Sequence, residues 1–253
     1  MTDPLADPLA DAETTCDLLV GDWFIHQLRR GHRFNTDDLL LAWLARRERP
    51  DAESVLDLGC GVGSVGLLTL AGLSPAARLV GVEAQAVSAA LYRRTLAQNG
   101  LEARVTAREG DLRDETTRAG LGRFDLVLGN PPYLPESAAL RSPNPQRAAA
   151  RLELRGDVFD YARVAAAHLK PDGVFGLVHS ARDPRPERAL AAAGLTLRRR
   201  QDVVFRHGQP PMIALFTAGF GGERQDPPPL AVRGEDGAWT AAYQGVRRDL
   251  GLA

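Results

Sequence analysis

In the stretch SVLDLGCGVGSVG, residues 54–66, a short apolar run leads directly into closely spaced glycines. An apolar run of this length is typical of a strand that is buried on both faces of a parallel sheet. Gly59, Gly61 and Gly63 allow a tight turn and a close approach of the backbone to a ligand before the next helix begins. Open α/β sheets bind ligands at the carboxyl ends of their strands, so we expect a binding site here.

The alternation that starts at this stretch continues along the chain. Short apolar runs alternate with longer amphipathic or alanine-rich runs, which predicts βαβ units in a parallel sheet. We therefore predict an α/β fold with a doubly wound, mostly parallel, seven-stranded sheet that a closing antiparallel strand pair completes. The expected strands span residues 54–58, 78–83, 103–108, 124–129, 173–179, 197–205 and 210–218. The expected helices span residues 36–47, with Thr36 as the N-cap, and 64–72, 86–99, 156–169 and 185–193.

Composition divides the chain into a tail and one domain. Residues 1–20 are acidic and interrupted by prolines, so we predict a mobile tail that is neither a signal peptide nor a membrane anchor. Residues 21–253 are predicted to form a single domain. Its parts are an N-terminal segment (21–50), a core (51–218) and a C-terminal extension (219–253) with a small strand and a terminal helix. No apolar run reaches the ~20 residues that span a bilayer.

Charge and cysteine content narrow the classes of partner. The formal net charge is −1, and nearly all the positive charge is arginine, since Lys170 is the only lysine. Arginine suits phosphates and stacked bases, whereas near-neutrality argues against strong nonspecific binding to nucleic acid. Cys16 and Cys60 are the only cysteines, and neither has CxxC spacing or a nearby histidine cluster. We therefore expect no metal, no disulfide framework and a reducing, cytoplasmic location.

The glycine loop alone leaves the cofactor ambiguous. Gly61, Gly63 and Gly66 also satisfy GxGxxG, a weak signature of dinucleotide sites that would suit an NAD-dependent dehydrogenase. However, Asp57 lies two residues before the glycines, and its carboxylate would repel the phosphates of a dinucleotide. A cationic ligand without phosphate, such as S-adenosylmethionine, is favoured instead.

Acidic residues at three successive strand ends fit that cofactor. Asp57 is predicted to lie at the mouth of the pocket near the positive charges, and Glu83, at the end of the next strand, to bind the ribose hydroxyls. Asp111 follows the third strand and can accept a hydrogen bond from the adenine amine. Leu112 can supply a backbone N–H and an apolar contact to the adenine ring. Each acid alone could instead cap a loop or face solvent.

The stretch FDLVLGNPPY, residues 124–133, ends a buried strand in a way that suits chemistry on an amine. The lone pair of an exocyclic amine on a base is delocalised into the ring and must be localised before it can attack. The side-chain oxygen of Asn130 and the carbonyl of Pro131 can each accept one N–H of such an amine. Tyr133 is predicted to stack on a base that has left its helix. An ordinary turn, with a loop aromatic covering the sheet edge, is the alternative.

The motifs VLDLGCGVG, VGVEA, EGDL and NPPY, in this order, resemble those of the Rossmann-type, or class I, S-adenosylmethionine-dependent methyltransferases. NPPY resembles the branch that methylates planar nitrogens. The segments GHRFNTDDLLLAWLA and GEDGAWTAAYQGVRRDLGL are similar to those of the bacterial tRNA1(Val) adenine-37 N6-methyltransferase family, and the resemblance extends from about residue 22 to the end. It implies that the cofactor is bound by Asp57, Gly59, Gly61, Gly63, Glu83 and Asp111, with Thr36 bordering its methionine end.

The expected function is methylation of the exocyclic N6 amine of adenine in RNA, with tRNA as the substrate. We expect a monomer that binds RNA and no membrane. Methylation of a ribosomal RNA base or of a protein glutamine at N5, as in release factor methyltransferases, stays open, although the latter usually carry a longer helical N-terminal domain. A noncatalytic RNA-binding module is the alternative from a different class. Four arginines after NPPY are candidates to close over the substrate, with solvated helix surface as the other interpretation: Arg141, Arg147, Arg151 and Arg155.

Overall fold

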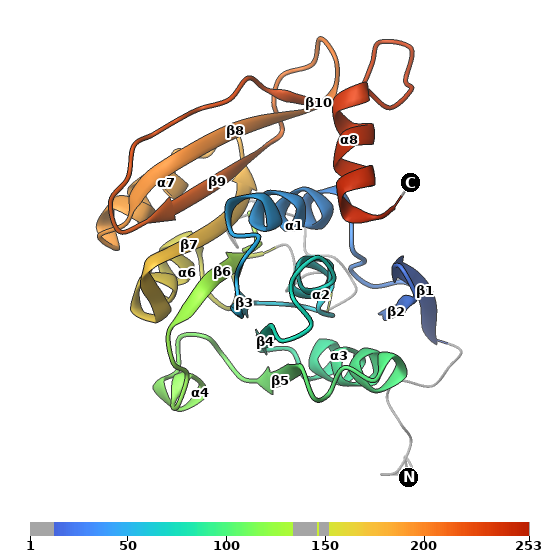
Figure 1. Ribbon diagram of the computed structural model, residues 1–253, viewed down its shortest axis with the longest axis vertical. Coiled ribbons are helices and arrows are strands. Elements are labelled where there is room, and N and C mark those ends of the chain that lie inside the picture. The colour runs from blue at the N-terminus through green and yellow to red at the C-terminus, as the bar shows by residue number, and fades with distance from the viewer. Residues whose placement is uncertain (1–12, 134–145, 147–151, 253) are drawn as a thin grey trace.

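The computed structural model describes residues 13–133, 146 and 152–252, and its centre is an eight-stranded sheet with helices on both faces (Figure 1). The strands, in the order in which they lie, are β10 (Leu230–Arg233), β8 (Thr196–Arg206), β9 (Ile213–Gly219), β7 (Leu169–Ser180), β6 (Phe124–Gly129), β3 (Ser54–Leu58), β4 (Arg78–Glu83) and β5 (Val105–Glu109). Only β9 runs antiparallel to its neighbours. The predicted α/β class with an antiparallel closing pair is confirmed.

Helices cover both faces of the sheet, and its central strands, such as β6 and β9, are buried throughout. One core contains side chains of α1 (Thr36–Glu48), α2 (Ser64–Leu70), α3 (Ala86–Asn99) and α8 (Ala241–Leu250). The other contains side chains of α6 (Val158–His168) and α7 (Arg185–Ala192). Within β3, Val55 belongs to the first core and Leu56 to the second. Successive side chains of a strand point to opposite faces, so continuous apolar runs arise where both faces are covered.

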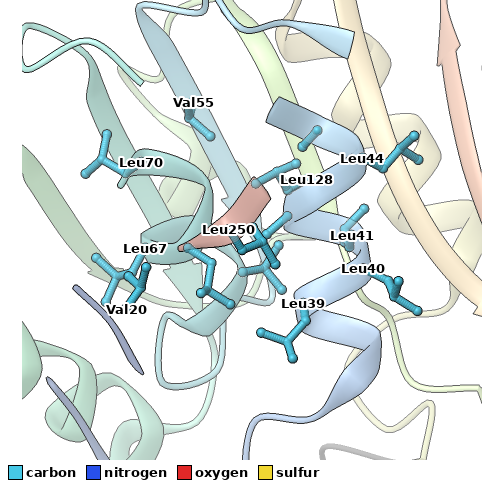
Figure 2. Packing of buried hydrophobic residues seen from close by; sticks show 14 of the residues in the cluster. Val20, Leu39, Leu40, Leu41, Leu44, Val55, Leu67, Leu70, Leu128 and Leu250 are labelled. Carbon is cyan, nitrogen blue, oxygen red and sulfur yellow. The ribbon is translucent and has the colours of Figure 1, made fainter. Parts of the chain in front are cut away.

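Helix α1 packs against both the central sheet and the C-terminal helix α8. Figure 2 shows leucines of α1 beside Leu128 of β6 and Leu250 of α8. The N-cap of α1 is Asn35, so the prediction that Thr36 caps this helix is wrong. Asn35 is preferred because its side chain accepts from the Asp37 N–H, and Asp38 in turn accepts from the Asn35 N–H at 3.1 Å. This capping box fixes both aspartates at the start of the helix.

Two sequence-based predictions about the ends of the chain are wrong. The sheet has eight strands, because β10 pairs in parallel with the edge strand β8 and buries Leu230 and Val232. Part of the predicted mobile tail is ordered: β1 (Thr14–Val20) pairs with β2 (Trp23–Leu28) in an antiparallel hairpin. Leu19 and Val20 of β1 are buried in the first core, which explains why this segment is ordered. Residues 1–12 lie outside the described part.

Two smaller findings complete the description of the fold. A short helix, α4 (Glu115–Arg118), follows β5 and was not expected from the sequence. Within the described residues, no helix combines the length and the apolar character that crossing a membrane requires.

Candidate active site

Two cavities meet at the carboxyl ends of the central strands. The inner cavity lies between the glycine loop, the end of β4 and the loop after β5, and Asp57, Gly61 and Glu83 are among its lining residues. The outer cleft lies between the segment before α1 and the loop that joins β8 to β9. It is the larger, with a volume of about 1130 Å³ against about 90 Å³ for the inner cavity. Asn130 lines both, so it lies on the wall that the two spaces share.

The glycine loop after β3 has the backbone that its sequence predicts. Gly59 and Gly61 have φ angles of 62° and 57°, in the left-handed region that favours glycine. A Cβ on Gly59 would collide with the hydroxyl of Tyr161, whereas one on Gly61 would meet no heavy atom within 4 Å. Open space at Gly61 is what the close approach of a ligand requires. Gly63 does not line the inner cavity among the described residues; it begins α2 and packs against Tyr92.

Asp57 lies at the base of the inner cavity. The prediction that it sits at the mouth of the pocket is wrong, because the residue is only 2% exposed. Its Oδ2 accepts a hydrogen bond from the backbone N–H of Gly66 at 2.9 Å. No described residue donates a hydrogen bond to its Oδ1, although the residue lines the cavity. Burial, together with the nearby charges of Asp38 and Glu83, raises the pKa of Asp57 to about 8.

Glu83 joins the end of β4 to the glycine loop. Its Oε2 accepts from the Gly61 N–H at 2.9 Å, and its Oε1 accepts from the Gln85 N–H at 2.7 Å. Burial raises the pKa of this carboxyl, and the two backbone donors oppose that rise. The carboxylate is therefore fixed in orientation at the cavity wall.

The two residues predicted to contact the adenine behave differently. Leu112 is buried and lines the inner cavity, as expected for an apolar contact to a ring. Asp111 is not among the described residues that line the cavity. Its oxygens are bound by the guanidinium of Arg113 at 2.7 and 3.0 Å, and these hydrogen bonds lower the pKa of Asp111. The structure therefore brings Asp57, Glu83 and Leu112 together in the inner cavity. The Asp111 carboxylate is paired with Arg113 and does not join them.

Asn130 is held by a network of hydrogen bonds from α1 and the NPPY segment. Its Nδ2 donates to Asp38 Oδ1 at 2.8 Å, and its Oδ1 accepts from the Tyr133 hydroxyl at 2.8 Å. The same hydroxyl lies 3.1 Å from Asp37 Oδ2, so its single proton is shared between the two acceptors. An amide oxygen has two lone pairs, so one stays available after the bond from Tyr133. The orientation of the Asn130 amide is thus set on both sides.

Asp38 is a site residue that sequence reasoning missed. It is 5% exposed, lines the inner cavity and also accepts from the Ser64 hydroxyl at 3.2 Å. Burial raises its pKa. The available signal was a second aspartate in the first turn of the helix, directly before three consecutive leucines. Thr36 lines neither cavity, so α1 contributes Asp38 and Asp37 in place of the threonine.

The outer cleft combines aromatic and basic side chains. The ring of Tyr133 lies 5.0 Å from that of His179, with a tilt of 53° between the planes. Phe34 and Phe205 line the same space, and Pro131 is part of its wall. Three arginines line it on the side of the segment before α1: Arg29, Arg30 and Arg33.

Of the four arginines after NPPY, Arg155 alone lies among the described residues. Arg141, Arg147 and Arg151 lie outside the described residues. Arg155 lines the inner cavity and donates to the Ala84 carbonyl at 3.0 Å. It therefore lies beside the acids of the inner cavity, where its charge helps to lower the pKa of Asp111.

Known proteins with similar sequences are methyltransferases. The family model of the methyltransferase small domain matches residues 35–193. The tRNA1(Val) (adenine(37)-N6)-methyltransferase of Shewanella amazonensis is 30% identical over 223 residues, which make up 88% of this chain and 93% of that protein. The release factor glutamine methyltransferase of Geobacter sulfurreducens is 37% identical over 137 residues, covering 51% of this chain and 46% of that protein.

Solved structures give the same fold. A predicted O-methyltransferase from Agrobacterium tumefaciens has a TM-score of 0.63 and 24% identity, and the match covers 86% of this chain and 98% of that one. A ribosomal protein L11 methylase from Lactobacillus delbrueckii has a TM-score of 0.52 and 15% identity, over 76% of this chain and 81% of that chain. At these identities the likeness shows the fold alone.

Proposed function

The chain belongs to the methyltransferase small domain family, and from that premise we propose that it transfers a methyl group from S-adenosylmethionine to the N6 amine of an adenine in RNA, with tRNA as the substrate. The position of Asn130 carries this proposal. It lines both the inner cavity, with its acids, and the outer cleft, with its aromatic and basic side chains. A group that must touch a methyl donor and an acceptor base at once belongs on such a shared wall.

The residues of the inner cavity fit this cofactor. Asp57 offers a buried carboxylate oxygen without a described donor, and Glu83 offers a fixed carboxylate for vicinal hydroxyls. Gly61 leaves room at the loop and Leu112 gives an apolar wall. When bound, the cofactor supplies an electrophilic methyl group on a sulfonium.

The residues of the outer cleft would hold the base. The free lone pair of Asn130 Oδ1 accepts one N–H of the target amine, and the Pro131 carbonyl accepts the other. This arrangement directs the amine lone pair toward the inner cavity. Tyr133 provides a flat surface for the base, backed by His179. Neither acceptor needs a charge, because the amine would release its proton to solvent only after positive charge has developed on the nitrogen.

Three classes of substrate are known among the similar proteins: tRNA, ribosomal RNA and the glutamine of a release factor. The arginines and aromatics of the outer cleft favour a nucleotide over a glutamine side chain. The match to the Shewanella tRNA enzyme spans most of both proteins, whereas the match to the release factor enzyme spans about half of each. A ribosomal RNA small subunit methyltransferase C of Pasteurella multocida is 38% identical over 38% of this chain. Cytoplasmic location, where these RNAs are found, is part of the proposal.

Methyl transfer from labelled S-adenosylmethionine tests the proposal directly. Purified protein is incubated in parallel with unmodified total tRNA, ribosomal RNA and a release factor. We expect label in tRNA, recovered as N6-methyladenosine by mass spectrometry of the nucleosides. Label only in the release factor or in ribosomal RNA would replace the proposed substrate. Cofactor binding without transfer to any of the three would favour the noncatalytic RNA-binding module.

Affinity for the cofactor is expected to rise with pH, because Asp57 must be ionised to attract a cation. Since its pKa is raised to about 8, the carboxyl is mostly protonated at neutral pH in the free protein. Affinity should increase by up to about tenfold per pH unit below that value and level off above it. The raised pKa of Asp57 also lowers the free energy of unfolding of the free protein as pH rises toward 8. In the unfolded state this carboxyl has an ordinary pKa, so the unfolded state loses its proton first and is favoured as pH rises. Calorimetry between about pH 6 and pH 9 measures both affinity and proton release.

The Asp57→Asn variant is the control for this pH dependence. It cannot ionise, so its weaker affinity should vary much less over the same range. A wild-type affinity that is flat in pH, or a dependence that persists in Asp57→Asn, would contradict the assignment to this carboxyl.

Replacing Asp38 by alanine is expected to lower kcat with little change in the KM for RNA, because the Asn130 amide would lose the acceptor that orients it. A hydrogen bond to a charged group is worth about 1.5–3 kcal/mol, so the loss should be roughly 10- to 100-fold. Asp38→Asn keeps an acceptor oxygen and should recover part of the rate. Asp37→Ala is the matched control, because Asp37 bonds only to Tyr133 within this network. Equal losses in the two alanine variants would contradict a positioning role for Asp38.

A further inference from the structure

Trp239, in the C-terminal extension, is an exposed aromatic residue with two guanidinium groups at its ring. The residue is 40% exposed and lies just before α8. The guanidinium carbon of Arg247 lies 4.2 Å from the ring centroid, and that of Arg233 lies 5.8 Å away. Tyr243 supports the ring edge-on at 6.0 Å. The segment lies outside the region that the family model matches.

Both arginines are anchored by backbone carbonyls. Arg233 donates to the Gly237 carbonyl at 2.7 Å, and Arg247 donates to the Leu252 carbonyl. No carboxylate among the described residues forms an ion pair with either of them, in contrast to Arg185, Arg200 and Arg224. A guanidinium held in place by neutral carbonyls keeps its charge available for an anion.

The acids of this region are engaged elsewhere. Glu235 pairs with His207 at 3.4 Å, and Asp236 accepts from the Ala238 backbone N–H at 3.0 Å. They reduce the net positive charge of the region, which favours selective contacts over a general attraction for polyanions.

This cluster lies on β10 and α8, beside the strand β8, whose end borders the outer cleft. Arg233 of β10 lies opposite Arg206 of β8, and Trp239 forms a bridge with Arg233 on the other side. Adjacent strands lie roughly 5 Å apart, so the Trp239 backbone is about 10 Å from β8. The His207 N–H bonds to the Arg233 carbonyl at 2.8 Å and ties the loop after β8 to β10, with α8 alongside (Figure 1). Phe205, near the end of β8, and Met212, in that loop, line the outer cleft.

We propose that Arg206, Arg233, Trp239 and Arg247 form an RNA-binding extension of the outer cleft, which holds nucleotides flanking the target base. The arginines contact phosphates, and the exposed part of the indole ring offers a stacking surface to an unpaired base. This inference rests on the proposed function, because it requires an RNA substrate. It assigns the C-terminal extension a role in selecting RNA that the cofactor site cannot supply.

Fluorescence anisotropy with labelled, unmodified tRNA tests this extension on the full-length protein. Trp239→Ala and Arg247→Ala are each expected to weaken binding by roughly tenfold. In Arg247→Ala the slope of log affinity against log salt should fall by about one, whereas in Trp239→Ala it should stay unchanged. A purely structural role for the indole and guanidinium groups would not produce this difference in slopes.

Arg78→Ala is the matched control. Arg78 is exposed, also bonds to a backbone carbonyl and lies on β4, toward the other edge of the sheet, so its loss should leave affinity unchanged. Thermal melting shows whether each variant is folded. If Arg247→Ala does not fold, Arg247→Lys, which retains the charge, is measured in its place. It should still bind more weakly than wild type.

The outcomes separate this inference from the proposed function. Unchanged tRNA affinity in the folded Trp239 and Arg247 variants of a protein that methylates tRNA would overturn the extension alone. An equal loss in Arg78→Ala would also overturn it, since binding would then follow overall charge. Absence of tRNA methylation by the wild-type protein would instead overturn the proposed function.

Discussion

Methyl transfer by the Asn130→Ala variant is expected to be roughly 10²- to 10³-fold slower than by the wild-type protein, the range for loss of one preorganised hydrogen-bonding group at a reacting centre. Cofactor affinity should be nearly unchanged. The loss should appear in kcat, because the contact matters most when charge develops on the amine. Single-turnover transfer to tRNA and calorimetry with S-adenosylhomocysteine measure the two quantities separately.

The geometry explains why no neighbour can replace this side chain. Tyr133 and Asp38 both use their polar atoms to hold Asn130, and the Pro131 carbonyl supplies only the second acceptor. With alanine, the target amine would retain one acceptor, and its lone pair would stay partly in the ring. The Tyr133 hydroxyl would keep Asp37 as its partner, so the stacking surface should survive.

Asn99→Ala is the matched control for general destabilisation. Asn99 makes three hydrogen bonds of 2.7–2.8 Å away from both cavities, two of which join α3 to Phe24 of β2 and one of which goes to the Thr95 carbonyl within α3. Its removal should lower the melting temperature and leave the transfer rate of the folded protein intact. A transfer rate in Asn130→Ala close to that of wild type would contradict the catalytic role, and a large loss of cofactor affinity would reassign the residue to cofactor binding.

The central sheet was predictable because its signals are local. The strands at 54–58, 78–83 and 124–129 were placed correctly from apolar runs that end in glycine, acid or proline. Each run is continuous because helices bury both faces, and this leaves a pattern that is visible without a partner. Because β3 and β4 pair in parallel, their carboxyl ends lie at the same edge of the sheet, and this brings Asp57 and Glu83 to one site.

What could not be predicted depends on contacts between distant segments. The β1–β2 hairpin is held against α3 by bonds such as that from the His26 N–H to Thr95, which no local pattern reveals. Asp38 bonds to Asn130 across 92 positions of sequence. Asp111 was expected to face the cofactor, but Arg113, two residues later, competes for its carboxylate. The sequence shows that such side chains are polar, but their hydrogen-bond partners depend on which segments the fold brings together.

Loss of the Glu83 carboxylate is expected to reduce cofactor affinity by roughly 10²-fold or more, because each hydrogen bond from a ribose hydroxyl to a charged acceptor is worth about 1.5–3 kcal/mol. Glu83 also holds the Gly61 and Gln85 N–H groups, so Glu83→Ala would loosen the glycine loop as well. Glu83→Gln separates these effects, because the amide keeps one acceptor oxygen and nearly the same volume. Glu109→Ala is the matched control: it lies opposite Glu83 on β5 and pairs with Arg93.

A ligand lacking one hydroxyl makes the assignment to the ribose testable. In the wild-type protein, 2′-deoxy-S-adenosylhomocysteine should bind at least about tenfold more weakly than S-adenosylhomocysteine. In Glu83→Gln this difference should shrink, because the interaction that the hydroxyl makes is already weakened and the two changes are not additive. Calorimetry of the four combinations gives the coupling between side chain and hydroxyl. Additive losses would show that Glu83 acts only by holding the glycine loop, and the ribose contact would have to be assigned elsewhere.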